Sequence, residues 1–258
     1  MPQVQNRVLG KGKLFFDQFI TGTKTKQGRR YLGNTPEFSQ AIESETLDHF
    51  NSDLGIREKD DSVTLETNRS GKFITDNISP ENVAMFFLGT SGLFTQVATP
   101  VVNEAITVKD GHYYQLGAGL GYGMGVRNVT AVVVTNVGGT TTYSATTDYT
   151  LDAVAGTIYI ITAADGGTIP DGIVHADYTP AAESRTEILS GALSVEGELF
   201  FQATNPKGDL VDYLMPSVQI SPDGDYNLKG DEWQQIGFTV EFNKLNDATP
   251  AIVAHGRA

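Results

Sequence analysis

Cysteine is absent from the 258 residues of this sequence. Its absence excludes disulfide bonds, thiolate catalysis and cysteine-ligated zinc. Histidine is scarce and scattered, and no H-x-H or H-E-x-x-H pair occurs that could begin a metal site. The four histidines are His49, His112, His175 and His255. We therefore expect no metal, and we expect stability to come from packing and association.

Long hydrophobic runs are also missing. The N-terminal segment MPQVQNRVLGKGKL lacks the apolar core of a signal peptide. No apolar run approaches the roughly 20 residues that a membrane-spanning helix needs. These absences predict a protein that stays in the cytoplasm where it is made and has no membrane partner.

Positive charge is in short supply, because 18 basic residues stand against 31 acidic ones and leave a formal charge of -13. A general nucleic-acid-binding surface is not expected, since such surfaces depend on Lys and Arg. Seven of the basic residues lie within residues 1–33, where Asp17 is the only acid. This segment is interpreted either as a solvated, mobile terminus or as an arm that lies against an acidic neighbouring subunit.

Motifs of enzymes and cofactor sites are not found. The glycine cluster at residues 117–125 has neither of the spacings typical of nucleotide-binding loops. The acidic run at residues 223–227 begins like a calcium loop, but Leu228 and Gln234 occupy the positions that require Gly and Glu. No G-x-S-x-G motif occurs. We expect neither an enzyme nor a cofactor.

Two segments alternate between side-chain types in the way of β-strands. In residues 38–47, Phe38, Gln40 and Ile42 share one face, and the opposite face carries Ser39, Ala41, Glu43 and Glu45. In residues 62–69, Val63 and Leu65 share one face, and the other carries Ser62, Thr64, Glu66 and Asn68. The pattern predicts an antiparallel pair. The intervening residues 48–60 are expected to form a long polar loop, either buried against another chain or solvated.

One helix is predicted, beginning at Ser79-Pro80-Glu81 and ending at Gly89. Ser is a favourable N-cap, Pro fits the first turn, and the acid complements the positive end of the helix. Its apolar stripe consists of Val83, Phe86 and Phe87, and it is expected to pack across a sheet.

The composition changes near Gln96, after which charge thins and Gly, Thr, Val and Ala dominate until about Ala182. Short β-rich runs separated by turns predict a small inserted β-sandwich, immunoglobulin-like in architecture. These runs are 129–135, 140–144, 148–151, 156–162 and 173–178. The organisation expected is one β domain from residues 1–95 and 184–258, with residues 96–183 inserted.

Strand patterning returns after the insertion, at residues 193–204, 209–221 and 235–243. The last of these is the clearest, with Ile236, Phe238, Val240 and Phe242 on one face. The single tryptophan, Trp233, precedes this strand and is expected to be a core or interface anchor.

Three blocks of the sequence resemble the tail tube proteins of long-tailed bacteriophages. They are YLGNTPEFSQAIESETLDHF at 31–50, GIREKDDSVTLETNRSGKFITDNISPENVAMFFLG at 55–89, and DYLMPSVQISPDGDYNLKGDEWQQIGFTVEF at 212–242. The resemblance implies a mainly β fold, a tail-tube-type β-sandwich or barrel with one short flanking helix. It further implies a structural, non-enzymatic subunit whose hexameric rings stack into a tube that conducts viral DNA, with the inserted domain outside.

The resemblance also implies roles for particular residues. Contact with the next ring would fall on residues 47–60, through Leu47, Phe50, Leu54, Ile56 and Arg57. Candidates that face the lumen are Glu43, Glu45, Glu66 and Asn68. The expected partners are other copies of the chain and the tape measure, tail terminator and distal tail proteins, while DNA passes without specific binding. The protein would be found in the virion and, during assembly, in the host cytoplasm.

Two other classes of protein remain open. A secreted or surface carbohydrate-binding β-sandwich protein is supported by tandem β domains and ten tyrosines. A glycosidase on a β scaffold is supported only by the abundance of acidic residues.

Overall fold

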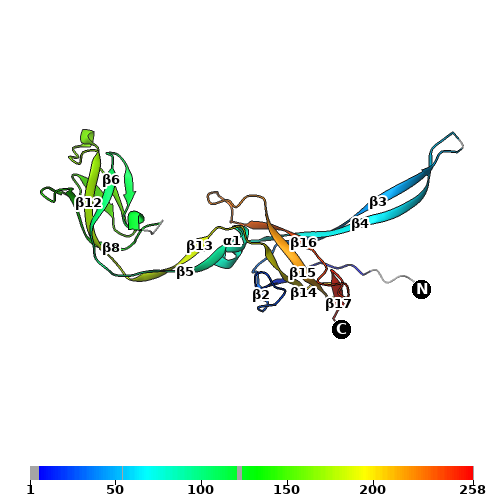
Figure 1. Ribbon diagram of the computed structural model, residues 1–258. Helices are drawn as coiled ribbons and strands as arrows, with labels where there is room; N and C mark the ends of the chain where they lie inside the picture. The colour runs from blue at the N-terminus through cyan, green and yellow to red at the C-terminus, as the bar shows by residue number, and fades with distance from the viewer. Residues whose placement is uncertain (1–5, 54, 121–123, 258) are drawn as a thin grey trace. The chain divides into compact units, whose positions relative to one another are not determined.

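The computed structural model describes residues 6–53, 55–120 and 124–257 (Figure 1). The fold is mainly β with one α-helix, which confirms the predicted fold class. The chain divides into two compact units. The main unit comprises the residues up to Gly92 together with those from Ile188 onward, and the small unit is Leu93–Glu187. The boundaries expected from the sequence, at residues 96 and 183, lie within four residues of these.

The main unit is built on one antiparallel sheet of eight strands (Figure 1). Seven strands follow the order β2 (Arg30–Tyr31), β1 (Gly12–Gln18), β14 (Val195–Ala203), β15 (Val211–Asp223), β16 (Ile236–Phe242), β4 (Glu58–Thr75) and β3 (Glu37–Asn51). The eighth, β17 (Val253–Gly256), pairs with the first part of β15. The sheet therefore ends in a two-residue strand on one side and a fifteen-residue strand on the other.

The core of the main unit lies on one face of this sheet. The predicted alternation of β16 is confirmed, because Ile236, Phe238 and Val240 are fully buried. The sheet curls over this core, since Phe38 on β3 lies 5.8 Å from Phe201 on β14 between ring centroids. The arrangement is a strongly curved sheet that encloses its own apolar side chains.

The helix α1 (Pro80–Phe86) covers part of this core, as predicted. Asn82 N donates to the hydroxyl of the N-cap Ser79 at 3.3 Å. Val83 joins the buried cluster, and Phe86 packs edge-to-face against Phe238 with centroids 6.2 Å apart. Phe87, the third member of the predicted stripe, remains 39% exposed.

The N-terminal segment is solvated in part, since residues 6–11 and 20–29 are exposed, but its middle part is built into the sheet. β1 lies inside the sheet, and Leu14 and Phe16 are buried. Residues 19–29 then fold back over the opposite face, where Arg29 and Lys26 form ion pairs with Glu198. Because the Glu198 side chain is only 2% exposed, it depends on these cations. Part of the basic segment thus finds its acidic partner within its own chain.

The prediction of a long loop at residues 48–60 was wrong. β3 continues to Asn51 and β4 begins at Glu58, so the connection is only residues 52–57. The pairing includes two register shifts, after Glu45 and after His49. At each shift one extra residue of β4 has no directly opposed residue on β3. Because both faces of these strand ends are exposed, they show no apolar stripe, and the sequence pattern looked like a loop.

The small unit contains two antiparallel sheets over one core, as in a β-sandwich. One sheet has the order β6 (Val101–Val108), β12 (Gly172–Pro180), β8 (Val129–Asn136) and β9 (Thr142–Tyr143), and the other has β10 (Tyr149–Asp152), β11 (Thr157–Ile160) and β7 (Tyr113–Gln115). β6 and β7 lie outside the β-rich runs predicted from the sequence. Two 3-10 turns, Ala118–Leu120 and Ala163–Asp165, complete the small unit. The strands β5 (Thr90–Gln96) and β13 (Glu183–Leu189) pair where the chain passes between the units.

Candidate assembly surfaces

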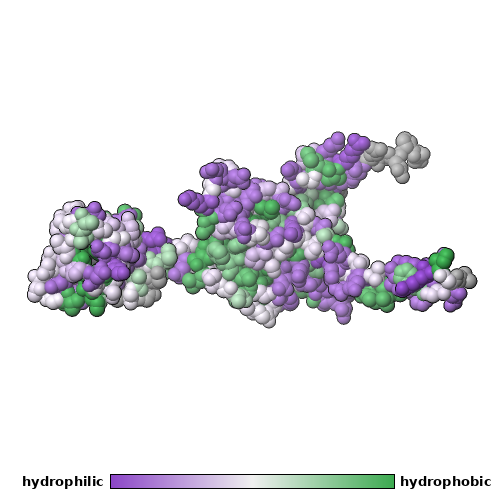
Figure 2. All heavy atoms as spheres, turned by 90° about the horizontal axis from the view of Figure 1, so that it is seen from above, coloured by the Kyte–Doolittle hydropathy of each residue, from purple (hydrophilic) through white to green (hydrophobic). Residues whose placement is uncertain are grey.

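The outer part of the β3–β4 hairpin is the least protected region of the main unit. β16 pairs with β4 only from Ser70 to Thr75, so residues 42–69, here called the ribbon, have no third strand. None of the described residues of the ribbon is buried. Its exposed apolar side chains are Ile42 (63%), Leu47 (62%), Phe50 (37%), Ile56 (73%), Val63 (56%) and Leu65 (60%). Figure 2 shows apolar and hydrophilic side chains next to each other on the arm that reaches furthest to the right.

A two-stranded hairpin alone is marginally stable in water, because it lacks a face on which to bury its apolar residues. The ribbon exposes large apolar side chains on both of its strands. It is therefore suited to packing against another surface.

Four of the five predicted contact residues lie on or beside this ribbon. Leu47 on β3 stands opposite Val63 on β4. The Arg57 guanidinium lies over the Phe50 ring, 4.4 Å from its centroid. Ile56 lies in the short connection and is exposed. Leu54 lies outside the described residues.

The four predicted lumen residues come together on one face of the ribbon. Glu43 stands opposite Asn68, and Glu45 stands opposite Glu66. Directly opposed residues of an antiparallel pair point to the same side. This side is opposite to that of Phe38 and its neighbour Phe73, which pack in the core. The pairing therefore creates an acidic patch of Glu43, Glu45 and Glu66 on the sheet face that points away from the core.

The outer edge of β3 is long and unpaired. Fifteen residues of strand extend for roughly 50 Å at about 3.3 Å per residue. Proteins protect such edges with charged side chains, especially lysine, and with proline, bulges or very short strands. β3 is long and has no Pro, Lys or Arg, and its charged residues Glu37, Glu43, Glu45 and Asp48 are all acidic, so they oppose pairing with an acidic strand more than with a basic one. The edge is available for pairing with another strand.

Trp233 is not a core residue, contrary to one of its two predicted roles. It is 93% exposed and lies on the loop between β15 and β16. Leu228 on the same loop is 76% exposed. The loop therefore exposes two large apolar side chains. The other predicted role of Trp233, an interface anchor, requires such exposure in the single chain.

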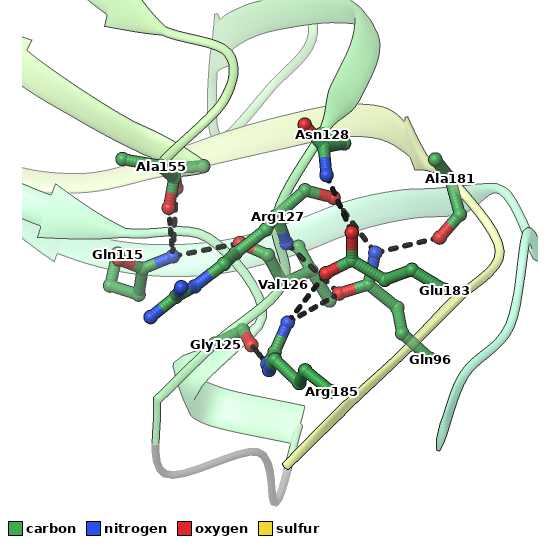
Figure 3. A network of polar contacts seen from close by, with 11 residues as sticks. Gln96, Gln115, Gly125, Val126, Arg127, Asn128, Ala155, Ala181, Glu183 and Arg185 are labelled. Carbon is green, nitrogen blue, oxygen red and sulfur yellow. Dashed lines mark hydrogen bonds and ion pairs between the residues drawn. The ribbon is translucent and has the colours of Figure 1, made fainter. Parts of the chain in front are cut away.

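A polar network in the small unit fixes the inner ends of β5 and β13 (Figure 3). Gln96, which is 3% exposed, donates to the carbonyls of Arg127 and Ala181 at 2.8 and 2.7 Å and accepts from Arg127 N at 2.9 Å. Arg185 donates to Gly125 O at 2.8 Å, and its guanidinium stacks 4.5 Å from the Phe94 ring centroid. These groups are satisfied by one another, so the network is a structural anchor.

The described residues form no evident chemical site. The described part of the chain contains no group of three or more His, Asp or Glu side chains placed to hold a metal ion. Every buried side-chain nitrogen and oxygen in that part has a hydrogen-bond partner. The most exposed apolar features of the described main unit are therefore the ribbon and the Trp233 loop, and β3 gives the sheet its longest edge.

Among the described residues, no helix is both long and apolar enough to cross a membrane.

Comparison with known proteins identifies a family for this chain. The sequence matches no curated protein. The model of the family described as "Protein of unknown function UCP028589" matches residues 7–257, nearly the whole sequence, and the chain therefore belongs to this family.

Proposed function

We propose that this chain is a self-assembling structural subunit, the tube-forming protein of a phage tail, whose hexameric rings stack into a channel for DNA. Two observations carry the proposal: the ribbon exposes apolar side chains on both of its strands, and β3, which it contains in part, ends the sheet in an open fifteen-residue edge. Phage, hexamer and tube come from the resemblance of residues 31–50, 55–89 and 212–242 to tail tube proteins.

Association of identical copies would supply a pairing strand for the open edge and a surface that covers the exposed apolar side chains. An open strand edge is removed when the sheet continues into a neighbour, and a head-to-tail arrangement that closes forms a ring. Apolar side chains such as Leu47 and Val63 would be covered in the same step. Each large apolar side chain that becomes buried stabilises the assembly by about 1.5–3 kcal/mol.

The acidic face of the ribbon has a role within this proposal. Glu43, Glu45 and Glu66, with Asn68, would face the lumen, where negative charge repels DNA phosphates and prevents tight contacts. Replacing Glu66 by Lys is expected to slow DNA release from particles whose tubes remain intact. Unchanged release kinetics would remove the lumen assignment and leave the assembly proposal standing.

A second function, carbohydrate binding by the small unit, is favoured by one observation. Tyr113 and Tyr159 are directly opposed on β7 and β11, with ring centroids 4.7 Å apart, and Tyr113 is 75% exposed. Such amphipathic rings can pack on a sugar face while their hydroxyls stay in water. Binding on a glycan array that is lost in Tyr113→Ala would support this function.

Assembly is tested by electron microscopy and sedimentation of the full chain, with and without preformed tail tips as seeds. The wild-type chain is expected to form rings or tubes. The variant Leu47→Ser/Val63→Ser is expected to stay monomeric with an unchanged melting temperature, because these side chains are already exposed in the monomer. The control Val137→Ser/Val154→Ser changes equally exposed valines of the small unit and is expected to assemble normally.

Two results would contradict the proposal. One is a wild-type chain that stays monomeric at every concentration and with every seed. The other is a Leu47→Ser/Val63→Ser variant that assembles as well as the wild type.

A further inference from the structure

The two ends of the eight-stranded sheet carry opposite charge on the same face. At one end, the ribbon has eight acids and three bases, and Glu43, Glu45 and Glu66 lie on the face away from the core. At the other end, residues 6–13 carry Arg7, Lys11 and Lys13 and no acid. Lys13 is exposed and stands opposite Gln202 of β14.

The pairing register shows that both charged groups lie on one continuous face. Across the sheet, Glu196 on β14 stands opposite Gln219, which stands opposite Glu241, and Glu241 stands opposite Ser70 on β4. Ser70 in turn stands opposite Ala41 on β3, two residues before Glu43. On β1, Lys13 shares this face because Leu14 and Phe16 point into the core.

The positive charge at the β1 end is only partly neutralised within the chain. Lys24, Lys26 and Arg29 are paired with Glu196 and Glu198. In the part of the chain that the structure describes, Lys11 and Lys13 form no ion pair, and Lys13 lies 5.9 Å from the centroid of the Tyr31 ring. The acids Glu43, Glu45 and Glu66 likewise have no cationic partner in the described ranges.

The sheet edges next to these charges are both open. β3 has no strand on its outer side. At the other end, β2 pairs with β1 at Phe15 and Phe16, and Leu32 N donates to Leu14 O at 3.0 Å, so the described pairing on this side stops before Lys13. Exposed apolar residues accompany the open edges, with Ile42 on β3 and with Leu9 and Tyr31 near β1.

We infer that neighbouring copies join head to tail, with the β3 edge of one copy beside the β1–β2 end of the next. The acidic face around Glu43 and Glu45 then contacts Lys11 and Lys13 of the neighbour. This inference rests on the proposed self-assembly and adds which edges meet and which charges select them. Charge complementarity of this kind fixes register and suppresses wrong pairings. A heterologous contact repeated in one direction closes into a ring.

The test is reciprocal charge reversal in the full chain. Variant A is Lys11→Glu/Lys13→Glu, and variant B is Glu43→Lys/Glu45→Lys. Each variant alone places like charges at every junction, and we expect the concentration needed for assembly to rise about ten-fold or more at low salt. The control Lys109→Glu/Arg127→Glu has the same charge change as variant A at exposed positions of the small unit.

Restoration is the decisive measurement. In a 1:1 mixture of A and B, every A–B junction again joins opposite charges, so alternating rings are expected at close to the wild-type concentration. A chain that carries all four substitutions should also assemble by itself, which shows that the variants fold.

The outcomes separate this inference from the proposed function. If the wild type assembles and A and B assemble equally well, or if neither the mixture nor the four-fold variant recovers, the edge pairing is overturned while self-assembly stands. A wild-type chain that does not assemble under any condition overturns both.

Discussion

In the small unit, Ile158 and Ile160 of β11 are fully buried, whereas in the ribbon Val63 and Leu65 of β4 are 56% and 60% exposed. Both pairs are large apolar residues in antiparallel strands. They differ in what lies across from them, because β11 belongs to one of two sheets that share a core and the ribbon faces no second layer. The comparison shows that strand pairing alone buries little, and that a second layer is what completes a β structure.

A single strand repeats the same contrast. Phe73, near the end of β4, has no exposed surface and stacks on Phe238 with centroids 4.9 Å apart. Leu65, eight residues earlier on the same strand, is exposed. The sheet provides a core for one part of β4 and leaves the other part to a partner.

The largest expected effect separates these two parts of β4. Phe73→Ala is expected to destabilise the main unit by about 3–5 kcal/mol, because it opens a cavity in a closed core. Leu65→Ala is expected to change the stability of the monomer by no more than about 0.5 kcal/mol. Urea unfolding followed by circular dichroism measures both, and sedimentation should show that Leu65→Ala alone impairs assembly of a folded chain. Equal destabilisation by the two substitutions would mean that the ribbon already has a partner within its own chain.

Local sequence patterns predicted those parts of the fold that are decided locally. The alternation of Ile236, Phe238 and Val240 identified β16, because one of its faces meets the core along its whole length. Ser79 and Pro80 marked the start of α1, because capping involves only neighbouring residues. The lumen candidates came together because strand alternation and antiparallel pairing are enough to place Glu43 beside Asn68.

Features decided by distant parts of the chain were missed. The basic charge of residues 1–33 concealed the burial of Leu14, which depends on β14, almost 190 residues away. The buried Glu198 that receives Arg29 lies 169 residues away in the sequence. Trp233 was expected from its residue type to be covered, and the single chain provides nothing to cover it. No pattern within a short window of sequence reports such contacts.

An intermediate effect on stability is expected inside the small unit, at a carboxylate that is buried within that unit. Asp148 is 6% exposed and accepts hydrogen bonds from Thr168 Oγ1 and Ser144 N, both at 2.7 Å, and from Thr168 N at 3.0 Å. Asp148→Asn replaces one accepting oxygen by a donor and is expected to cost about 1–3 kcal/mol. Hydrogen exchange of β10 and β11 measures this loss, with exchange in the main unit as the control.

The same carboxylate gives a pH dependence. Hydrogen bonds from Thr168 and Ser144 lower the pKa of Asp148 below its ordinary value. The stabilisation that they provide is therefore present above the ordinary pKa of an aspartate and is lost as the pH falls through the lower pKa of the folded state. Protection of β10 and β11 should fall over that acidic range in the wild type and stay flat in Asp148→Asn. A flat wild-type profile would contradict the assignment.

The smallest effect is expected in the ribbon, where an ion pair lies in water. Lys59 Nζ lies 2.6 Å from Asp48 Oδ1, with side chains 48% and 33% exposed, and Ser62 Oγ donates to the same oxygen at 2.9 Å. These contacts, that with Lys59 first, lower the pKa of Asp48. Lys59→Met should therefore raise this pKa towards its ordinary value, as measured by NMR titration of the carboxyl carbon.

The stability of the folded monomer should not change in Lys59→Met, because exposed ion pairs often contribute nothing measurable to it. Any contribution of the pair to the folded state is fully present above the ordinary pKa of an aspartate and is lost as the pH falls through the lowered pKa of Asp48. The melting temperatures of the wild type and Lys59→Met should therefore agree at neutral and at acidic pH. A clear drop in the variant at neutral pH would show that the ribbon is held by its own charges. In that case it would resemble the self-sufficient small unit, and its dependence on a second copy would have to be abandoned.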